Sequence, residues 1–160
     1  MDCSHVQFCV HEGFTTGTCS RDIDLEQLQE LFRVTAHWGR DRQIPDLEIA
    51  IRNSKPVVTI WDGAHLIGFA RATSDGVYRA TIWDVLVHPD YQGAGLGRKL
   101  VETVLMHPHV NRAERVYLMT THQQKFYERI GFEENQTTTM VLFNQSVLQQ
   151  ELSQVTEALQ

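Results

Sequence analysis

Residues 87–100 read V-H-P-D-Y-Q-G-A-G-L-G-R-K-L, and this stretch joins a β-branched run to an amphipathic one. Pro89 ends the predicted strand, because proline donates no hydrogen bond to a neighbouring strand. Gly93, Gly95 and Gly97 then allow the backbone to turn tightly at the start of the next helix. Backbone N–H groups that converge at a helix start bind phosphate groups. The stretch therefore predicts a strand, an anion-binding turn and a helix.

Three other interpretations of this turn compete with that one. A Rossmann dinucleotide site requires G-x-G-x-x-G, but Arg98 occupies the position of the third glycine. A P-loop ends in G-K-[ST], whereas Arg98-Lys99-Leu100 offers no hydroxyl for magnesium. A tight turn without a ligand stays open as the structural alternative. A pyrophosphate-binding turn, with Arg98 and Lys99 adding positive charge at its rim, needs only features that are present.

The rest of the chain carries strand and helix patterns that fill one domain. Apolar periodicity predicts strands over 6–10, 55–61, 66–73, 78–87 and 116–119, helices from 22 or 24 to 32 and over 46–53, 95–106 and 123–130, and two short strands within 132–143. The strands before the glycine turn form an antiparallel meander, and the strand after the following helix is a parallel neighbour. We expect an α+β fold, with a mainly antiparallel, mixed sheet of six to seven strands and about four helices. Residues 1–144 form this domain, and 145–160 form a tail with a helical pattern.

Composition narrows the classes of partner. The 160 residues carry a net charge of −6, which argues against nucleic acid and favours small cations. No apolar run approaches the ~20 residues of a membrane span. The first residues lack the pattern of a secretory signal, so we expect a cytoplasmic protein with no membrane partner. Cys3, Cys9 and Cys19 show no CxxC spacing, and we expect reduced thiols.

The order of these motifs resembles that of the GCN5-related N-acetyltransferase (GNAT) family. The family's acetyl-CoA motif, Q/R-x-x-G-x-G/A after a V-x-P strand end, stands here as Val87-His88-Pro89 followed by Gln92-Gly93-Ala94-Gly95-Leu96-Gly97. Downstream, F-Y-E-R-I-G-F at 126–132 is similar to the family's Y-E-x-x-G-F segment. The resemblance implies a GNAT fold with a central splay between strands, and acetyl-CoA as cosubstrate.

The resemblance also implies which residues contact acetyl-CoA. Backbone N–H groups of the strand at 85–87, which bulges in the family, are implied to hold the pantetheine arm and polarise the thioester carbonyl. Thr120 stands where many members have asparagine, seven residues before the tyrosine, and its hydroxyl replaces part of that bonding. The implied cofactor-binding residues are Val85, Leu86, Val87, Gln92, Gly93, Ala94, Gly95, Leu96, Gly97, Arg98, Thr120 and Phe126.

Two residues are candidates for acid–base catalysis of acetyl transfer. An alkylamine has a pKa of about 10 and must lose a proton before it attacks. Asp84 lies within an apolar strand where the family commonly places its base, although a structural ion pair is the alternative. Tyr127 occupies the family's general-acid position, with a packed aromatic as the alternative. All three cysteines precede the motifs, which favours direct attack in a ternary complex over a covalent route.

The acceptor side rests on weaker patterns. In the family, the loop between the first two helices walls the acceptor pocket, and here this loop contains Trp38. Trp38 and Trp83 are candidates for stacking on an aromatic ligand, with burial in the core as the alternative. His122 is a candidate proton relay near the substrate. The histidines show no metal-binding spacing, so we expect no metal.

The acceptor itself is suggested by a finer resemblance. D-V-L-V-H-P-D-Y-Q-G-A-G-L-G and L-M-T-T-H-Q-Q-K-F-Y-E-R-I-G-F look like the branch that contains plastid and cyanobacterial serotonin N-acetyltransferases. This implies a small arylalkylamine such as serotonin or tryptamine, and a place in melatonin biosynthesis. Polyamines, amino acids, protein lysines or N-termini, and a non-catalytic acyl-CoA-sensing module stay open. A homodimer formed through the tail also stays open.

Overall fold

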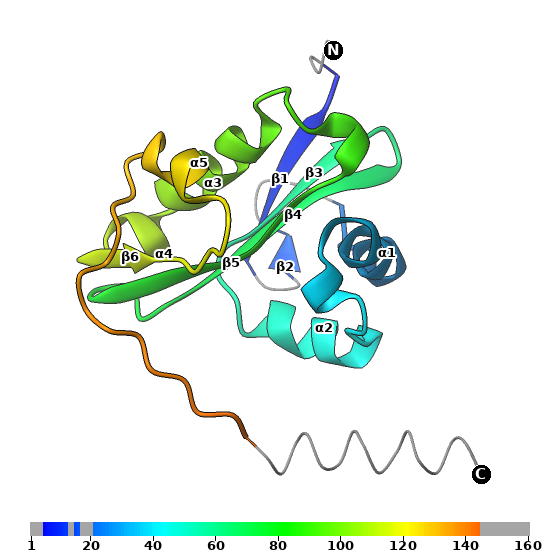
Figure 1. Ribbon diagram of the computed structural model, residues 1–160. Coiled ribbons are helices and arrows are strands. Elements are labelled where there is room, and N and C mark those ends of the chain that lie inside the picture. The colour runs from blue at the N-terminus through cyan, green and yellow to red at the C-terminus, as the bar shows by residue number, and fades with distance from the viewer. Residues whose placement is uncertain (1–4, 13–14, 17–20, 145–160) are drawn as a thin grey trace.

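The computed structural model describes residues 5–12, 15–16 and 21–144, which build one mixed sheet with helices on both faces (Figure 1). The strands are β1 (Gln7–Glu12), β2 (Thr15–Thr16), β3 (Val57–Asp62), β4 (His65–Ser74), β5 (Arg79–Val87) and β6 (Arg115–Tyr117). The helices are α1 (Leu25–Thr35), α2 (Ile44–Arg52), α3 (Leu96–Met106), α4 (Pro108–Asn111), α5 (Gln124–Glu128) and the 3-10 helices η1 (His37–Gly39) and η2 (Pro89–Tyr91).

The sheet is mainly antiparallel, as the strand pattern predicts. Its order is β2-β1-β3-β4-β5-β6, and β5 with β6 is the parallel pair. The α+β fold class is therefore confirmed, with six strands among the described residues. The short helix α4 was not predicted, because four residues are too few for a helical period to show.

Helix α1 begins where a polar side chain caps it. One oxygen of the Asp24 carboxylate accepts a hydrogen bond from the N–H of Gln27 at 2.9 Å. This bond satisfies one of the amides that a helix start leaves unpaired. The apolar side of the helix buries Leu28, Leu31 and Phe32. The predicted start of the helix is confirmed.

Two clusters of buried side chains lie on opposite faces of the sheet. One joins α1 and α2 to the strands and includes Phe32, Leu47 and Phe69. The other joins α3 to the strands and includes Ile60 and Leu100. Figure 1 shows α1 and α2 on one side of the sheet, and α3 and α5 on the other. The sheet therefore separates the molecule into two layers that can carry different parts of a site.

Strand β5 is irregular at its centre and diverges from β6. Its register with β4 shifts so that both Asp84 and Val85 lie opposite Ala70, which is a β-bulge. Asp84 has a φ of 55°, in the left-handed region. Only residues 79–81 of β5 pair with β6, so within the described chain residues 82–87 have no strand on that side. The splay and the bulge that the resemblance implied are both present.

The expectation of two short strands within 132–143 is wrong. Residues 133–144 form no strand, and they pair with no strand among the described residues. β-Propensity alone does not place a strand, because a strand also needs a partner edge and side-chain packing. The predicted tail at 145–160 lies outside the described residues.

One cysteine departs from its expectation. Cys9, on β1, is fully buried and disulfide-bonded, so the expectation of reduced thiols is wrong for this residue. Spacing along the chain did not predict the bond, because a disulfide depends on distance in the fold. Cys3 and Cys19 lie outside the described residues.

No helix among the described residues is long and apolar enough to cross a bilayer.

Candidate active site

The glycine turn opens directly onto the N-terminus of α3. Gly93 and Gly95 have φ values of 82° and 80°, which disfavour any side chain. A Cβ built at either residue meets no atom within 4 Å, so the space beside the turn is open. The first helical hydrogen bond of α3 runs from Lys99 N–H to Gly95 O at 3.1 Å, and the amides before it have no acceptor within the helix. This open set of N–H groups at a positive helix end fits a pyrophosphate.

Gly97 lies where α3 faces α5 and the end of β5. A Cβ there would lie 3.4 Å from Phe126 Cζ and 3.7 Å from Val87 Cγ2. The Phe126 ring in turn packs edge-on against Tyr127, with ring centroids 4.9 Å apart. The glycine turn, the end of β5 and helix α5 are therefore held together.

Several predicted cofactor residues turn their side chains into the protein. Val85, Val87 and Ala94 pack against the α3-side cluster, and Leu96 is buried within it. Leu86 is buried in the cluster on the other face. Leu86 and Leu96 are buried, so these two residues can meet a ligand only through their backbone.

The polar members of the predicted cofactor set are engaged within the chain. The Gln92 side chain donates from Nε2 to Val87 O at 2.9 Å. Arg98 Nε donates to Glu102 at 2.7 Å across one helical turn. The Thr120 hydroxyl accepts from an amide at 3.1 Å and closes the turn before α5. Thr120 thus organises the chain around α5, whatever it contributes to a ligand.

Tyr127 is set up to hold a proton. Burial raises the pKa of its phenol above the ordinary value. The ring lies edge-on to Phe126 and to Phe132, the latter at 5.9 Å between centroids. A phenol in this setting stays protonated at neutral pH and can act as a proton donor.

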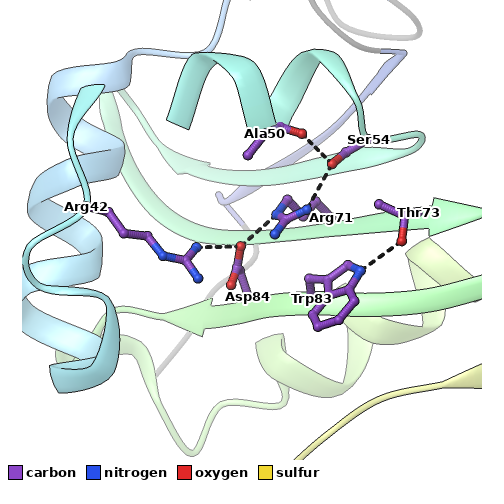
Figure 2. Close-up of polar contacts among 7 residues, drawn as sticks. All are labelled: Arg42, Ala50, Ser54, Arg71, Thr73, Trp83 and Asp84. Carbon is purple, nitrogen blue, oxygen red and sulfur yellow. Dashed lines mark hydrogen bonds and ion pairs between the residues drawn. The ribbon is translucent and has the colours of Figure 1, made fainter. Parts of the chain in front are cut away.

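Asp84 lies on the other face of the sheet, at the centre of a polar network (Figure 2). Its side chain is 4% exposed, and its Oδ2 accepts from Arg42 Nη1 at 2.8 Å and Arg71 Nε at 2.6 Å. Arg71 also donates to the Ser54 hydroxyl at 3.2 Å, which donates to Ala50 O at 2.6 Å. Two guanidinium groups therefore compensate the buried carboxylate. Both ion pairs use Oδ2, so neither of them occupies Oδ1.

The two predicted substrate tryptophans flank this network. Arg42 Cζ lies 5.1 Å from the centre of the Trp38 ring, and Trp38 is 58% exposed. Arg71 Cζ lies 5.9 Å from the centre of the partly buried Trp83 ring. The structure thus brings Trp38, Asp84 and Trp83 together through two arginines. His122 is an exposed residue of the turn before α5.

Sequence reasoning missed the residues that hold Asp84. Arg42 comes from the loop before α2, Ser54 follows α2, and Arg71 comes from β4. One signal was available, because Arg71 is a lone charge in the otherwise apolar run at 69–72. A charge in such a run requires a partner in the fold.

No three or more His, Cys, Asp or Glu side chains among the described residues are placed to hold a metal ion.

Comparison with known proteins identifies relatives of this chain. An uncharacterised ycf52-like N-acetyltransferase from Prochlorococcus marinus is 43% identical over 102 residues, which cover 61% of this chain and 56% of the relative. A chloroplastic GCN5-related N-acetyltransferase 2 from Arabidopsis thaliana is 38% identical and covers 70% of this chain and 51% of the relative. The chain spans 49% to 67% of the length of the curated relatives compared.

Solved structures and a family profile agree with these relatives. A GNAT family acetyltransferase from Streptococcus pneumoniae superposes with a TM-score of 0.68 at 26% identity, over 87% of this chain and 98% of the other. The profile described as the Acetyltransferase (GNAT) family matches residues 25–132, which include the glycine turn, Asp84 and Tyr127. The chain therefore belongs to the GNAT family of acetyltransferases, whose acyl donor is acetyl-CoA.

Proposed function

We propose that this protein transfers the acetyl group of acetyl-CoA to a primary amine, by direct attack of the amine in a ternary complex. The observation that carries the proposal is the placement of the glycine turn. It combines open backbone amides at the N-terminus of α3 with the end of β5 and with α5. An anion site, a strand edge that no strand covers within the described residues, and a proton donor thus lie together, as acetyl-CoA requires.

The chain's own groups fit this cosubstrate. Amides of the glycine turn bind the pyrophosphate, and the edge of β5 at 82–87, which no strand covers in the described chain, offers backbone groups to the pantetheine arm. Acetyl-CoA supplies an activated acyl group as a thioester. Tyr127 holds the proton that the departing thiolate needs, in keeping with its raised pKa.

The acceptor amine enters from the face that carries Asp84. Arg42 and Arg71 fix one carboxylate oxygen and leave Oδ1 outside both ion pairs. Asp84 then accepts a hydrogen bond from the incoming ammonium and takes its proton, directly or through one water molecule. Because β5 and β6 diverge after residue 81, the amine on this face can reach the thioester on the face that carries Tyr127.

An arylalkylamine is the acceptor that the surroundings of Asp84 favour. Trp38 and Trp83 lie on either side of the network and offer ring surfaces to an aromatic group, while the carboxylate suits a cationic amine. The resemblance to the serotonin N-acetyltransferase branch supports the same class. We place the reaction at an indole ethylamine such as tryptamine or serotonin.

A lysine side chain of a protein is the second candidate. A relative from Glycine max, 37% identical over 124 residues, is named histone acetyltransferase TAP1. The exposed Trp38 leaves the acceptor face accessible to a larger substrate.

The test is release of CoA thiol from acetyl-CoA in the presence of tryptamine, spermidine or a lysine peptide. We expect the highest kcat/KM with tryptamine. Preference for the peptide would move the assignment to protein lysines. Binding of CoA without turnover of any amine would contradict the enzymatic proposal and favour a sensing module.

A further inference from the structure

The ion-pair network at Asp84 carries a net positive charge. The Asp84 carboxylate contributes one negative charge, and the guanidinium groups of Arg42 and Arg71 contribute one positive charge each, which leaves a net charge of +1. Arg40 and Asp41, both exposed in the loop that carries Arg42, add no net charge. An acceptor with an ammonium group alone brings a further positive charge close to the two guanidinium groups. An acceptor that also carries an anionic group offsets this charge.

The Arg42 guanidinium has donors left over for such an anionic group. Its Nη1 donates to Asp84 at 2.8 Å, and this is its one hydrogen bond within the described part of the chain. A guanidinium carries five N–H donors in a planar fork. The Arg42 side chain is 34% exposed, whereas that of Arg71 is 15% exposed and also donates to Ser54. Arg42 is therefore the arginine of this network that a ligand can reach.

Two aromatic rings hold this guanidinium in place. Arg42 Cζ lies 4.7 Å from the centre of the Phe32 ring and 5.1 Å from the centre of the Trp38 ring. These two rings meet edge-on, with centroids 6.0 Å apart. Phe32 is fully buried, whereas Trp38 is exposed. The fork is thus fixed beside an aromatic surface that a ligand can reach, which reduces the entropy lost when the fork binds a carboxylate.

We propose that the acceptor face also takes aromatic α-amino acids, with Arg42 binding their carboxylate and Asp84 their ammonium group. This inference rests on the proposed acetyl transfer at Asp84. An α-amino acid carries both charged groups on one carbon atom, so they lie side by side. Arg42 and Asp84 are in direct contact and carry the complementary charges (Figure 2). The zwitterion therefore pairs with both members of the ion pair, and its ring lies against Trp38.

The reaction with such an acceptor is the same acetyl transfer. The ammonium group gives one proton to Asp84, and the neutral nitrogen forms an amide bond to the acetyl carbon as the C–S bond of the thioester breaks. Tyr127 gives its proton to the departing thiolate, and a second proton of the nitrogen replaces it. The products are an N-acetyl amino acid, CoA thiol and the proton that Asp84 releases to solvent. The carboxylate of the acceptor takes no part in these steps, so Arg42 acts on binding.

Two acceptors that differ only in the carboxylate test the inference on the wild-type protein. L-Tryptophan and tryptamine are each offered with acetyl-CoA, and kcat/KM is measured by release of CoA thiol. We expect both to be acetylated. Turnover of tryptamine without turnover of L-tryptophan overturns the inference and leaves the proposed function intact. If neither is turned over, the proposed function fails, and calorimetry with L-tryptophan and the CoA-loaded protein decides whether the amino-acid site exists.

The variant Arg42→Gln separates binding of the carboxylate from support of Asp84. The ratio of kcat/KM for L-tryptophan to that for tryptamine should fall by about tenfold to a hundredfold, because a charge-assisted hydrogen bond to the carboxylate is lost. Arg71→Gln is the matched control, since it removes the other ion pair of Asp84 at a less exposed side chain. It should lower both kcat/KM values and leave their ratio unchanged.

Two results with these variants overturn the inference. One is an unchanged ratio in Arg42→Gln, and the other is an equal fall of the ratio in Arg42→Gln and Arg71→Gln. If Arg42→Gln does not fold, indole-3-propionate, which has the carboxylate but no amine, is tested against acetylation of tryptamine by the wild type. Competitive inhibition supports a carboxylate site on the acceptor face, and absence of inhibition overturns it.

Discussion

The two faces of the sheet carry their functional groups in different ways. On the α3 face, the glycine turn is built from neighbouring residues, and Phe126 and Tyr127 are adjacent in the chain. On the α1 and α2 face, Asp84 depends on three side chains brought by different segments. The glycine turn is made by the backbone of a short motif, so substitutions elsewhere in the chain should leave it intact. The Asp84 network depends on the packing of segments that are far apart in the sequence. Cofactor binding and acceptor chemistry should therefore be separable by mutation.

Gly95→Glu should have the largest effect, because it abolishes the binding of CoA at the glycine turn. The φ of 80° strains any side chain, and a carboxylate at the positive end of α3 repels the pyrophosphate. We expect CoA binding, measured by calorimetry, to be lost in a folded protein.

Gly63→Glu is the control for backbone strain. Gly63 also has a positive φ, of 56°, but it lies in the turn between β3 and β4. Its CoA affinity should stay at the wild-type level. Unchanged affinity in Gly95→Glu would return the glycine stretch to a turn without a ligand.

Asp84→Asn should reduce acetyl transfer to the amine without weakening the binding of CoA. The amide keeps the shape of the carboxylate but cannot take a proton from the amine, so kcat should fall by about a thousandfold. CoA affinity should be retained, because the network lies on the other face from the glycine turn. Asp46→Asn, at an exposed position of α2, should keep full activity. A joint loss of turnover and CoA affinity would show that the two faces are not separable.

Tyr127→Phe should reduce kcat by about a hundredfold, since the departing thiolate loses its proton donor. Burial raises the pKa of Tyr127, so its phenol remains protonated below that raised value and loses its proton only as pH rises through it. From about pH 6 to about pH 9, the ratio of wild-type to variant kcat should therefore stay constant. A ratio that falls within this range would remove Tyr127 from the role of acid. Tyr78→Phe, at an exposed tyrosine, is the control.

Trp38→Ala should have the smallest effect, and it tests whether the acceptor amine carries an aromatic ring. Loss of one aromatic contact should raise KM for tryptamine about threefold to tenfold, with kcat unchanged. KM for spermidine should change less, since a polyamine offers no ring. Val34→Ala is a control at another exposed apolar residue of the same region. Equal changes for both amines would argue against aromatic stacking.

The strands, the helices and the glycine turn could be predicted from the sequence for a physical reason. Alternation, helical spacing and the glycine turn are properties of neighbouring residues, and the observed strands and helices lie close to the expected ranges. The strands expected within 132–143 did not form, because strand formation needs a partner edge that local sequence does not specify.

The partners of Asp84 lay beyond local reasoning. Arg42, Ser54 and Arg71 are 42, 30 and 13 residues away from it and meet only through strand pairing and helix packing. The disulfide bond of Cys9 was not predicted for the same reason, because its formation depends on distance in the fold. In both cases a pattern along the chain indicated a candidate but not its partner.

The most direct test of the account is turnover by the double variant Asp84→Asn/Tyr127→Phe, measured as CoA thiol release with tryptamine alongside CoA binding. CoA should still bind with wild-type affinity, while acetyl transfer should fall to the level of the uncatalysed reaction. Turnover that survives intact in this variant would contradict the assignment of acid–base chemistry to the two faces of the sheet.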